Sequence, residues 1–225
     1  MIELVVFDIA GTTVEENSAV YRALREAVVA AGGAPSDRDL ESWMGASKRE
    51  AITGMLADAL GAEPDSAVVD GAFDDFRQRL EAAYRAVPPT PIEGVPEVFA
   101  ALREREIKVV LTTGFDREVT DSLLAGLGWD STMLDGVICI DDVPRGRPAP
   151  YMIHQAMRLA GVIDVRSVLV AGDTARDLQA GTNAGAGVVI GVLTGDVSRQ
   201  SLKAEPHTHI LDSLADLLTE PSLLG

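Results

Sequence analysis

The hydrophobic positions of this chain form short, nearly continuous runs, separated by longer segments with helical periodicity. Apolar and β-branched residues recur at five places: Leu4–Phe7, Lys108–Thr112, Val137–Ile140, Val168–Val170 and Val188–Val192. Several runs lack polar and apolar alternation, as is typical of strands covered on both faces. Helical patterns lie between them, at Glu97–Arg105, Glu118–Leu127, Tyr151–Ala160 and Asp177–Ala184. The alternation predicts an α/β fold with a Rossmann-like, doubly wound parallel sheet, in which functional groups gather at the strand carboxyl ends.

Residues 16–87 interrupt this alternation and contain no convincing strand. The pattern predicts helices there, at Ala19–Ala31, Ser36–Trp43, Ser47–Leu60 and Ser66–Arg85. The stiff stretch Pro88–Pro91 then indicates a return to the sheet. We therefore expect a core domain made of residues 1–15 and 88–225, and a helical cap domain made of residues 16–87. Such an insertion is either decoration or a lid that excludes water and contributes side chains to the site.

The composition excludes several classes of partner. The 225 residues are 47% hydrophobic, ample for a buried core, and 35 acidic against 19 basic residues give a net charge of −16. Because there is no basic stripe and no apolar run of the ~18 residues that span a bilayer, we expect neither nucleic acid nor membrane as a partner. Cys139 is the one cysteine. We expect it to be a buried strand thiol in a cytoplasmic protein. Glu3 and Asp8, with no basic lead, argue against a signal peptide.

Acidic residues follow two separate strands. Asp8 ends the first apolar run and begins the stretch Asp8-Ile9-Ala10-Gly11-Thr12-Thr13. A carboxylate on a rigid strand end, with loop N–H groups around it, suits phosphoryl transfer. Asp173 and Asp177 follow a later strand at i, i+4 spacing. Since Mg²⁺ takes oxygen ligands, these three acids predict a magnesium site, although Asp173 as a helix cap is an alternative.

Two further strand ends carry polar groups. Thr113-Gly114 follows the run that ends at Thr112, so its hydroxyl and amides could hold a phosphoryl oxygen. Arg147, between Gly146 and Pro148 just before a helix, could neutralise a phosphoryl group and its attacking carboxylate. Each motif alone also fits an ordinary strand ending or a surface arginine.

The chain resembles the haloacid dehalogenase superfamily of phosphohydrolases over nearly its whole length. The resemblance is carried by the order of four motifs along the chain: Asp8, Thr113, Arg147 and the Asp173/Asp177 pair. The resemblance implies that Asp8 is the nucleophile and forms an aspartyl phosphate. It also implies that Arg147 takes the place usually filled by lysine.

The same resemblance implies a cofactor and its ligands. Mg²⁺ would be held by Asp8, the Ala10 backbone carbonyl and Asp173, with Asp177 ligating the metal or ordering its waters. Thr12, Thr113 and Gly114 would bind the phosphoryl oxygens of a small-molecule substrate.

Ala10 departs from the pattern of most superfamily phosphatases, which have a second Asp two residues after the nucleophile. That acid protonates the departing alkoxide, and such catalysis is typically worth ~10²–10⁴-fold. Ala10 therefore argues against ordinary phosphate-ester hydrolysis. It leaves either an inactive enzyme or a substrate whose leaving group is stabilised in another way.

The cap segment offers such a way. Met44-Gly45-Ala46-Ser47-Lys48 places an amine at a helix start, where the dipole and apolar neighbours could lower its pKa. A neutral lysine condenses with a carbonyl to an imine, whose cation withdraws electrons and lets a neighbouring C–P bond break. A lone lysine on a lid is otherwise a solvated surface residue.

Ala10, Arg147 and the Met44-Gly45-x-x-Lys48 motif together look like the phosphonoacetaldehyde hydrolase (phosphonatase) branch. The resemblance implies a Schiff base on Lys48, with Met44 and Gly45 beside the substrate, and hydrolysis of a 2-oxoethyl-type phosphonate. A dimer through the cap would also fit that branch. Two positions depart from it: Ala51 stands where the branch has histidine, and Phe115 where it has tyrosine.

Two other functions compete with this one. The first is a phosphatase of the same superfamily that uses Asp8 on a small phosphorylated metabolite without an imine. The second is a non-catalytic metabolite-binding module, which would have no reason to keep a nucleophile facing a metal site.

Overall fold

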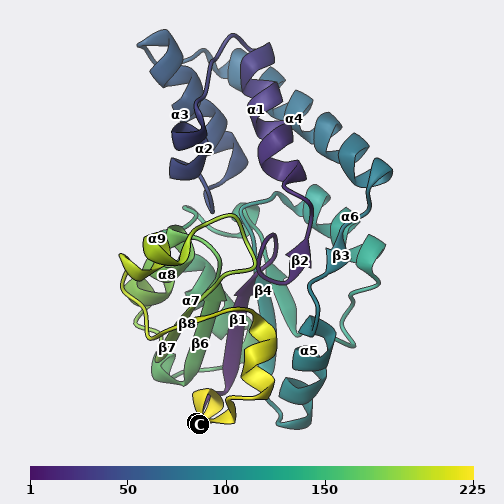
Figure 1. Ribbon diagram of the computed structural model, residues 1–225, viewed down its shortest axis with the longest axis vertical. Coiled ribbons are helices and arrows are strands. Elements are labelled where there is room, and N and C mark those ends of the chain that lie inside the picture. Colours follow the sequence, from purple (N-terminus) through teal and green to yellow (C-terminus); the bar gives the residue numbers. More distant parts are fainter.

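A computed structural model places a six-stranded parallel sheet at the centre of the molecule (Figure 1). It describes the backbone of residues 1–225 and every side chain except that of Pro221. The strand order is β5-β4-β1-β6-β7-β8. The strands are β1 (Leu4–Asp8), β4 (Lys108–Thr112), β5 (Gly136–Ile138), β6 (Val168–Gly172), β7 (Val188–Val192) and β8 (His209–Leu211).

The central strand β1 pairs with β4 on one side and β6 on the other. Its five residues are all buried, because helices cover both faces of the sheet. Leu4 and Val6 point toward a layer that contains α7 (Tyr151–Ala160) and α8 (Ala175–Ala184). Val5 and Phe7 point to the opposite layer, where Phe7 stacks on Phe99 of α5 (Val95–Glu104) at a centroid distance of 6.4 Å. The doubly wound α/β architecture predicted from the hydrophobic pattern is confirmed.

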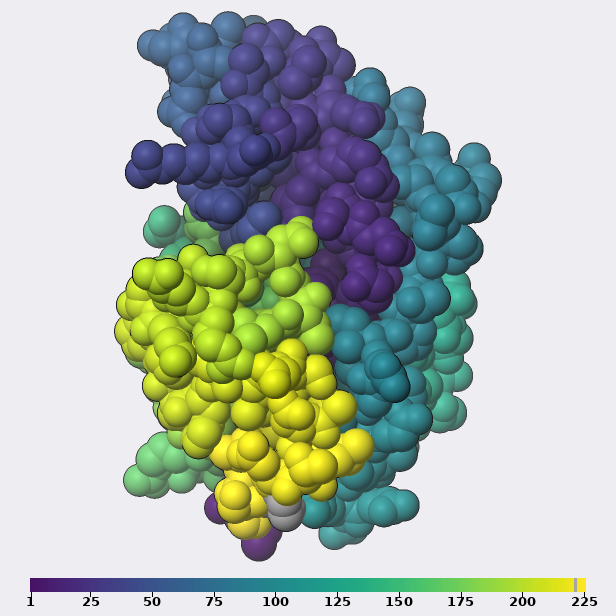
Figure 2. Space-filling view, in the orientation of Figure 1, coloured from purple at the N-terminus to yellow at the C-terminus, as the bar shows by residue number. Residues whose placement is uncertain are grey.

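Four helices lie together beyond the carboxyl ends of the strands, at the top of Figure 1. They are α1 (Ala19–Ala30), α2 (Asp37–Ser42), α3 (Lys48–Leu60) and α4 (Ser66–Ala86), and together they are called the helical layer below. The six-stranded sheet with the helices on its two faces is called the sheet layer. α1 packs against α3 and α4 through a shared apolar core. In the space-filling view these purple and blue helices meet the yellow-green part of the sheet layer along a seam (Figure 2).

A two-stranded ribbon connects the helical layer to the sheet layer. β2 (Val14–Glu15) pairs antiparallel with β3 (Thr90–Pro91), so the outgoing and the returning chain lie side by side. Asn17 and Ser18 follow β2 with φ values of 53°, a conformation that non-glycine residues seldom adopt. The sequence pattern did not predict this ribbon, since two residues are too few to show a period.

The remaining elements are α6 (Arg117–Leu127), α9 (Arg199–Lys203) and four short 3₁₀ helices: Ile140–Asp142, Val165–Ser167, Leu214–Leu218 and Pro221–Leu224. β8 and α9 were not predicted from the sequence. β5 begins one residue before the predicted run Val137–Ile140 and stops two residues short of its end, so Cys139 lies just after β5 rather than within it. Its thiol is nevertheless buried, as expected, and burial raises the pKa of Cys139 to about 11.

Candidate active site

Three neighbouring strand ends bring the predicted site residues together. Asp8 is the last residue of β1, and Thr113 follows the end of β4, which pairs with β1. Asp173 follows the end of β6, the other neighbour of β1. The three residues are about 165 positions apart at most in the chain, yet parallel pairing places them at one edge of the sheet. All three side chains are buried.

Asp8, Asp173 and Asp177 form a cluster of acids, with one carboxylate oxygen from each lying within 4.8 Å of the others. Thr12 Oγ1 donates a hydrogen bond of 2.9 Å to Asp173 Oδ1. Burial, and then the charge of Asp8, raise the pKa of Asp173 above its ordinary value. Buried carboxylates in this arrangement can hold a cation, and hard oxygen donors of this kind fit Mg²⁺.

Glycines allow the surrounding loops to approach the cluster closely. A Cβ at Gly11, where φ is +79°, would stand 2.6 Å from Asp173 Oδ2. A Cβ at Gly195, in the loop after β7, would overlap the same oxygen. Thr194 Oγ1 donates to the Gly11 carbonyl at 2.6 Å, so the two loops are joined beside the acid.

Arg147 supplies positive charge directly to the cluster. Its Nη1 lies 2.7 Å from Asp8 Oδ1 and also contacts Asp177 Oδ1, and its side chain is only 5% exposed. The Nε–H of Arg147 is buried without a hydrogen-bond partner in the part of the chain that the structure describes. The guanidinium therefore has a donor left over for a further acceptor, such as a phosphoryl oxygen.

The N-terminus of α8 holds the Asp177 side chain in position. Thr174 is the N-cap, and it shares a capping box with Asp177, whose Oδ2 accepts from the Thr174 hydroxyl and backbone N–H. The alternative in which Asp173 caps this helix is wrong. The Asp173 side chain is free of that role and faces Asp8 instead.

The loop between α2 and α3 packs onto this cluster from above. Gly45, with φ +77°, lies so close to Thr174 that a Cβ would overlap Thr174 Oγ1. A Cβ at Gly114 would stand 2.6 Å from the Ala46 carbonyl oxygen. Met44, the remaining predicted residue of this loop, is partly buried. The helical layer thus contacts the sheet layer at the strand ends that carry the acids.

Lys48 begins α3, and its side chain is 6% exposed although lysine is seldom buried. Its Nζ lies 5.3 Å from the centroid of the Tyr21 ring and 5.5 Å from that of Phe115, and it donates to the Ala46 carbonyl at 3.3 Å. Burial, and then the charge of Arg147, lower the pKa of Lys48 to about 8. The negative charges of Asp8, Glu16 and Asp173 act in the opposite direction.

Three neighbours of the site were missed by reasoning from the sequence. Glu16 is buried, accepts the Val20 N–H at 2.8 Å, and has a pKa raised mainly by burial. Tyr21 lies on α1 beside Lys48. Arg176 stacks on Trp43 at 5.4 Å and donates to the Ser42 carbonyl, which links α8 to the helical layer. Only Glu16 had a usable signal, as an acid that closely follows the loop after Asp8.

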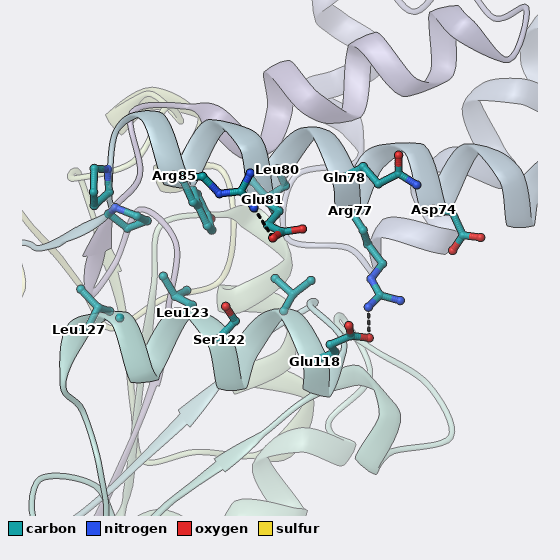
Figure 3. A pocket seen from close by; sticks show the side chains of 15 residues that line it. Asp74, Arg77, Gln78, Leu80, Glu81, Arg85, Glu118, Ser122, Leu123 and Leu127 are labelled. Atoms are coloured by element: carbon teal, nitrogen blue, oxygen red, sulfur yellow. Dashed lines mark hydrogen bonds and ion pairs between the residues drawn. The ribbon is translucent and has the colours of Figure 1, made fainter.

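Two cavities lie near the seam between the layers. One of about 460 Å³ reaches Lys48 and Gly114, and is also lined by Ser47, Phe73 and Ile140. The other, of about 660 Å³, lies between α4 and α6, where Arg77 pairs with Glu118 (Figure 3). Its lining contains none of the predicted site residues.

The three histidines are exposed and lie outside the site. Trp43 packs on Gly54 inside the helical layer. Among the described residues, none of the helices combines the length and the apolar character that crossing a bilayer requires.

Comparisons with known proteins agree with this geometry. The family model of the haloacid dehalogenase-like hydrolases matches residues 2–185. The chain is 29% identical to a phosphonoacetaldehyde hydrolase of Paraburkholderia phytofirmans, over 96% of this chain and 93% of that protein. It is 33% identical to a phosphonoacetaldehyde hydrolase of Bacillus cereus, over 84% of this chain and 76% of the other. A solved hydrolase of Pseudomonas syringae shares the fold with a TM-score of 0.87, at 20% identity and 98% coverage of both chains. The chain therefore belongs to the haloacid dehalogenase-like hydrolases, in the branch of the phosphonoacetaldehyde hydrolase-like enzymes.

Proposed function

We propose that this enzyme is a Mg²⁺-dependent phosphonatase that cleaves the C–P bond of a 2-oxoalkyl phosphonate, phosphonoacetaldehyde or a relative. The observation that carries the proposal is the buried Lys48 amine, whose pKa is lowered to about 8. A lysine that served only as a solvated surface group would not be desolvated at this cost. The names of the relatives from Paraburkholderia phytofirmans and Bacillus cereus support the same reaction class.

The helices of residues 16–87 act, in this proposal, as a cap domain over a core domain of residues 1–15 and 88–225. The paired strands β2 and β3 support this division, because both connections to the helices run through them. The close packing of Gly45 on Thr174 supports a cap that closes on the strand ends. Closure excludes water from an imine that water would otherwise hydrolyse.

Lys48 activates the carbon side of the substrate. Its amine adds to the carbonyl carbon, and loss of water leaves a protonated imine two bonds from phosphorus. When the C–P bond breaks, its electron pair moves into this cation and gives an enamine. No alkoxide is formed, so Ala10 in place of a general acid costs the reaction nothing at this step. Protonation of the enamine carbon and hydrolysis of the imine then return the amine.

Asp8 attacks the phosphorus side. Its carboxylate displaces the carbon fragment and forms an aspartyl phosphate, which water hydrolyses to inorganic phosphate. Arg147, within 2.7 Å of Asp8, offsets the charge of the transferring group. Asp8, Asp173 and Asp177 would hold Mg²⁺ together with the Ala10 carbonyl, and the ion, when bound, neutralises phosphoryl oxygens and the nucleophile's own charge.

The remaining predicted residues position the substrate. Thr12, Thr113 and the amide of Gly114 would bind phosphoryl oxygens from the core side. Met44 and Gly45 would flank the carbon fragment from the cap side. The 460 Å³ cavity that reaches Lys48 and Gly114 offers a route between the two sides.

Borohydride trapping tests the proposal directly. The chain has three lysines, Lys48, Lys108 and Lys203, so mass spectrometry assigns an adduct without ambiguity. With phosphonoacetaldehyde, Mg²⁺ and borohydride, we expect a stable adduct on Lys48 and loss of activity. Lys108 and Lys203 are exposed and serve as internal controls.

One variant separates the two halves of the reaction, and a second serves as its control. Asp8→Asn should still form the adduct but release phosphate more than ~10⁴-fold more slowly, because its amide is no nucleophile. Lys203→Arg should match wild type in both assays. Rapid phosphate release from phosphate esters or acyl phosphates, with no adduct from any carbonyl phosphonate, would favour a phosphatase that does not use Lys48. Full turnover by Asp8→Asn would exclude both enzymatic mechanisms.

A further inference from the structure

The Lys48 amine lies between two aromatic rings that differ by one hydroxyl. Phe115 stands 5.5 Å from Nζ on the core side, and Tyr21 stands 5.3 Å from it on α1. Phe115 occupies the position at which the phosphonatase pattern has tyrosine. A phenol is therefore present beside the amine in this chain, but it comes from a different element of the fold.

Tyr21 lies on α1 at the amine end of the candidate site, where Lys48 Nζ is 5.3 Å from its ring centroid. Asp173 and Asp8 lie near enough for their charges to act on the phenol. An ordinary phenol, with a pKa of ~10, keeps its proton at neutral pH. A carbonyl compound that forms an imine with Lys48 would lie beside the Tyr21 ring.

Imine formation requires protons to move between nitrogen and oxygen. Starting from the lysine ammonium, the balanced step is R–NH₃⁺ plus O=C giving R–NH⁺=C plus H₂O. Two protons leave nitrogen, and both end on the former carbonyl oxygen as it departs in water. A neutral phenol can give its proton to that oxygen while it accepts one from nitrogen, and it finishes unchanged. Neither Ala51 nor Phe115 has a group that exchanges protons.

We propose that Tyr21 is a further catalytic residue of this site, the proton relay between the Lys48 nitrogen and the substrate's carbonyl oxygen. Its hydroxyl replaces the one that position 115 lacks. The inference rests on the proposed imine at Lys48, and adds to it a residue that neither the motif pattern nor the fold assigns.

The experiment compares three variants in the Mg²⁺-loaded enzyme with phosphonoacetaldehyde. The rate of borohydride-trapped adduct on Lys48 is followed by mass spectrometry, alongside kcat and KM for phosphate release. We expect Tyr21→Phe to slow trapping and kcat by ~10²-fold, with KM changed far less. Adding Phe115→Tyr to that variant places a phenol on the opposite ring, and should restore at least a tenth of the lost rate.

Tyr84→Phe is the matched control. Its hydroxyl is also buried, has no hydrogen-bond partner within the described structure, and lines the cavity between α4 and α6. Loss of that hydroxyl should leave trapping and turnover at wild-type rates. A general effect of removing a tyrosine hydroxyl would appear in both single variants.

The outcomes distinguish the proposed proton relay at Tyr21 from the proposed imine at Lys48, on which the relay depends. Trapping by Tyr21→Phe at the wild-type rate overturns the relay and leaves the imine intact. A slow Tyr21→Phe that Phe115→Tyr does not accelerate assigns Tyr21 a packing role, and also overturns the relay. Absence of any Lys48 adduct in wild type removes the imine, and the relay with it.

Discussion

Gly45 of the α2–α3 loop packs directly onto the side chain of Thr174, which caps α8 and hydrogen-bonds Asp177. A residue of the helical layer therefore rests on the same threonine that orients one acid of the cluster. Lys48 follows Gly45 by three positions. The height of this loop above the sheet consequently sets how far the amine stands from the acids.

Gly45→Ala should lift this loop from the strand ends. The new Cβ would overlap Thr174 Oγ1, and misplacing a reacting group by about 1 Å can cost ~10²-fold, so we expect kcat/KM to fall by that order. Gly61→Ala is the control, because Gly61 also has positive φ, +64°, but nothing lies within 4 Å of its Cβ. Urea denaturation should show the cost of alanine at positive φ in both variants, with a further loss of stability from the overlap in Gly45→Ala. Equal kcat/KM values would contradict the packing argument.

The pH dependence of phosphonate cleavage should follow the Lys48 amine. Only the neutral amine adds to a carbonyl, and the pKa of Lys48 is lowered from 10.5 to about 8. Below that value the neutral fraction falls tenfold per pH unit, so log kcat/KM should rise with slope one and level off above pH 8. An unshifted lysine would instead show a rise that continues toward pH 10.

Lys48→Arg should abolish cleavage while calorimetric Mg²⁺ binding is retained, and cleavage at the wild-type rate would exclude the imine.

The charge of Glu16 should affect the pH at which kcat/KM for phosphonate cleavage rises. Its negative charge favours the Lys48 ammonium, so Glu16→Gln should lower the pKa of Lys48 further and shift the rise in kcat/KM to lower pH. The glutamine oxygen can still accept the Val20 N–H that Glu16 accepts now. Glu15→Gln, one position earlier and exposed, removes the same charge outside the site. A shift to higher pH, or the same shift in both variants, would argue against this electrostatic coupling.

The sequence predicted the sheet and the core side of the site because both depend on local patterns. A buried run that ends in Asp8 or precedes Asp173 already fixes a strand end, and parallel pairing brings such ends together. The part of the candidate site that the helical layer contributes depends on tertiary packing instead. Met44-Gly45-x-x-Lys48 pointed to Lys48 as a candidate by motif, but the burial of its amine between Tyr21 and Phe115 follows from how α1 and α3 pack.

Tyr21 shows why part of the site escaped prediction. In the sequence it is one aromatic residue on an amphipathic helix, no different from a core position. β2 and β3 escaped for a related reason, since a two-residue strand carries no periodicity and forms only where the chain leaves and re-enters the sheet layer. Arg176 likewise gains its role only when the Trp43 ring lies over it.

Gly195→Ala should weaken Mg²⁺ binding although it replaces none of the proposed ligand residues. The added Cβ would overlap Asp173 Oδ2, and the loop cannot retreat freely because Thr194 Oγ1 holds the Gly11 carbonyl at 2.6 Å. Displaced supporting residues typically cost metal sites ~10–100-fold in affinity, so calorimetry should show a loss of that size, and phosphate release should need correspondingly more Mg²⁺. Gly71→Ala, within α4, is the matched control: nothing lies within 4 Å of its Cβ, and alanine should stabilise that helix by ~0.5–1 kcal/mol while Mg²⁺ affinity stays at the wild-type value. Unchanged affinity in Gly195→Ala would mean that Asp173 does not ligate the ion, and that the cation site must be built from Asp8 and Asp177 without it.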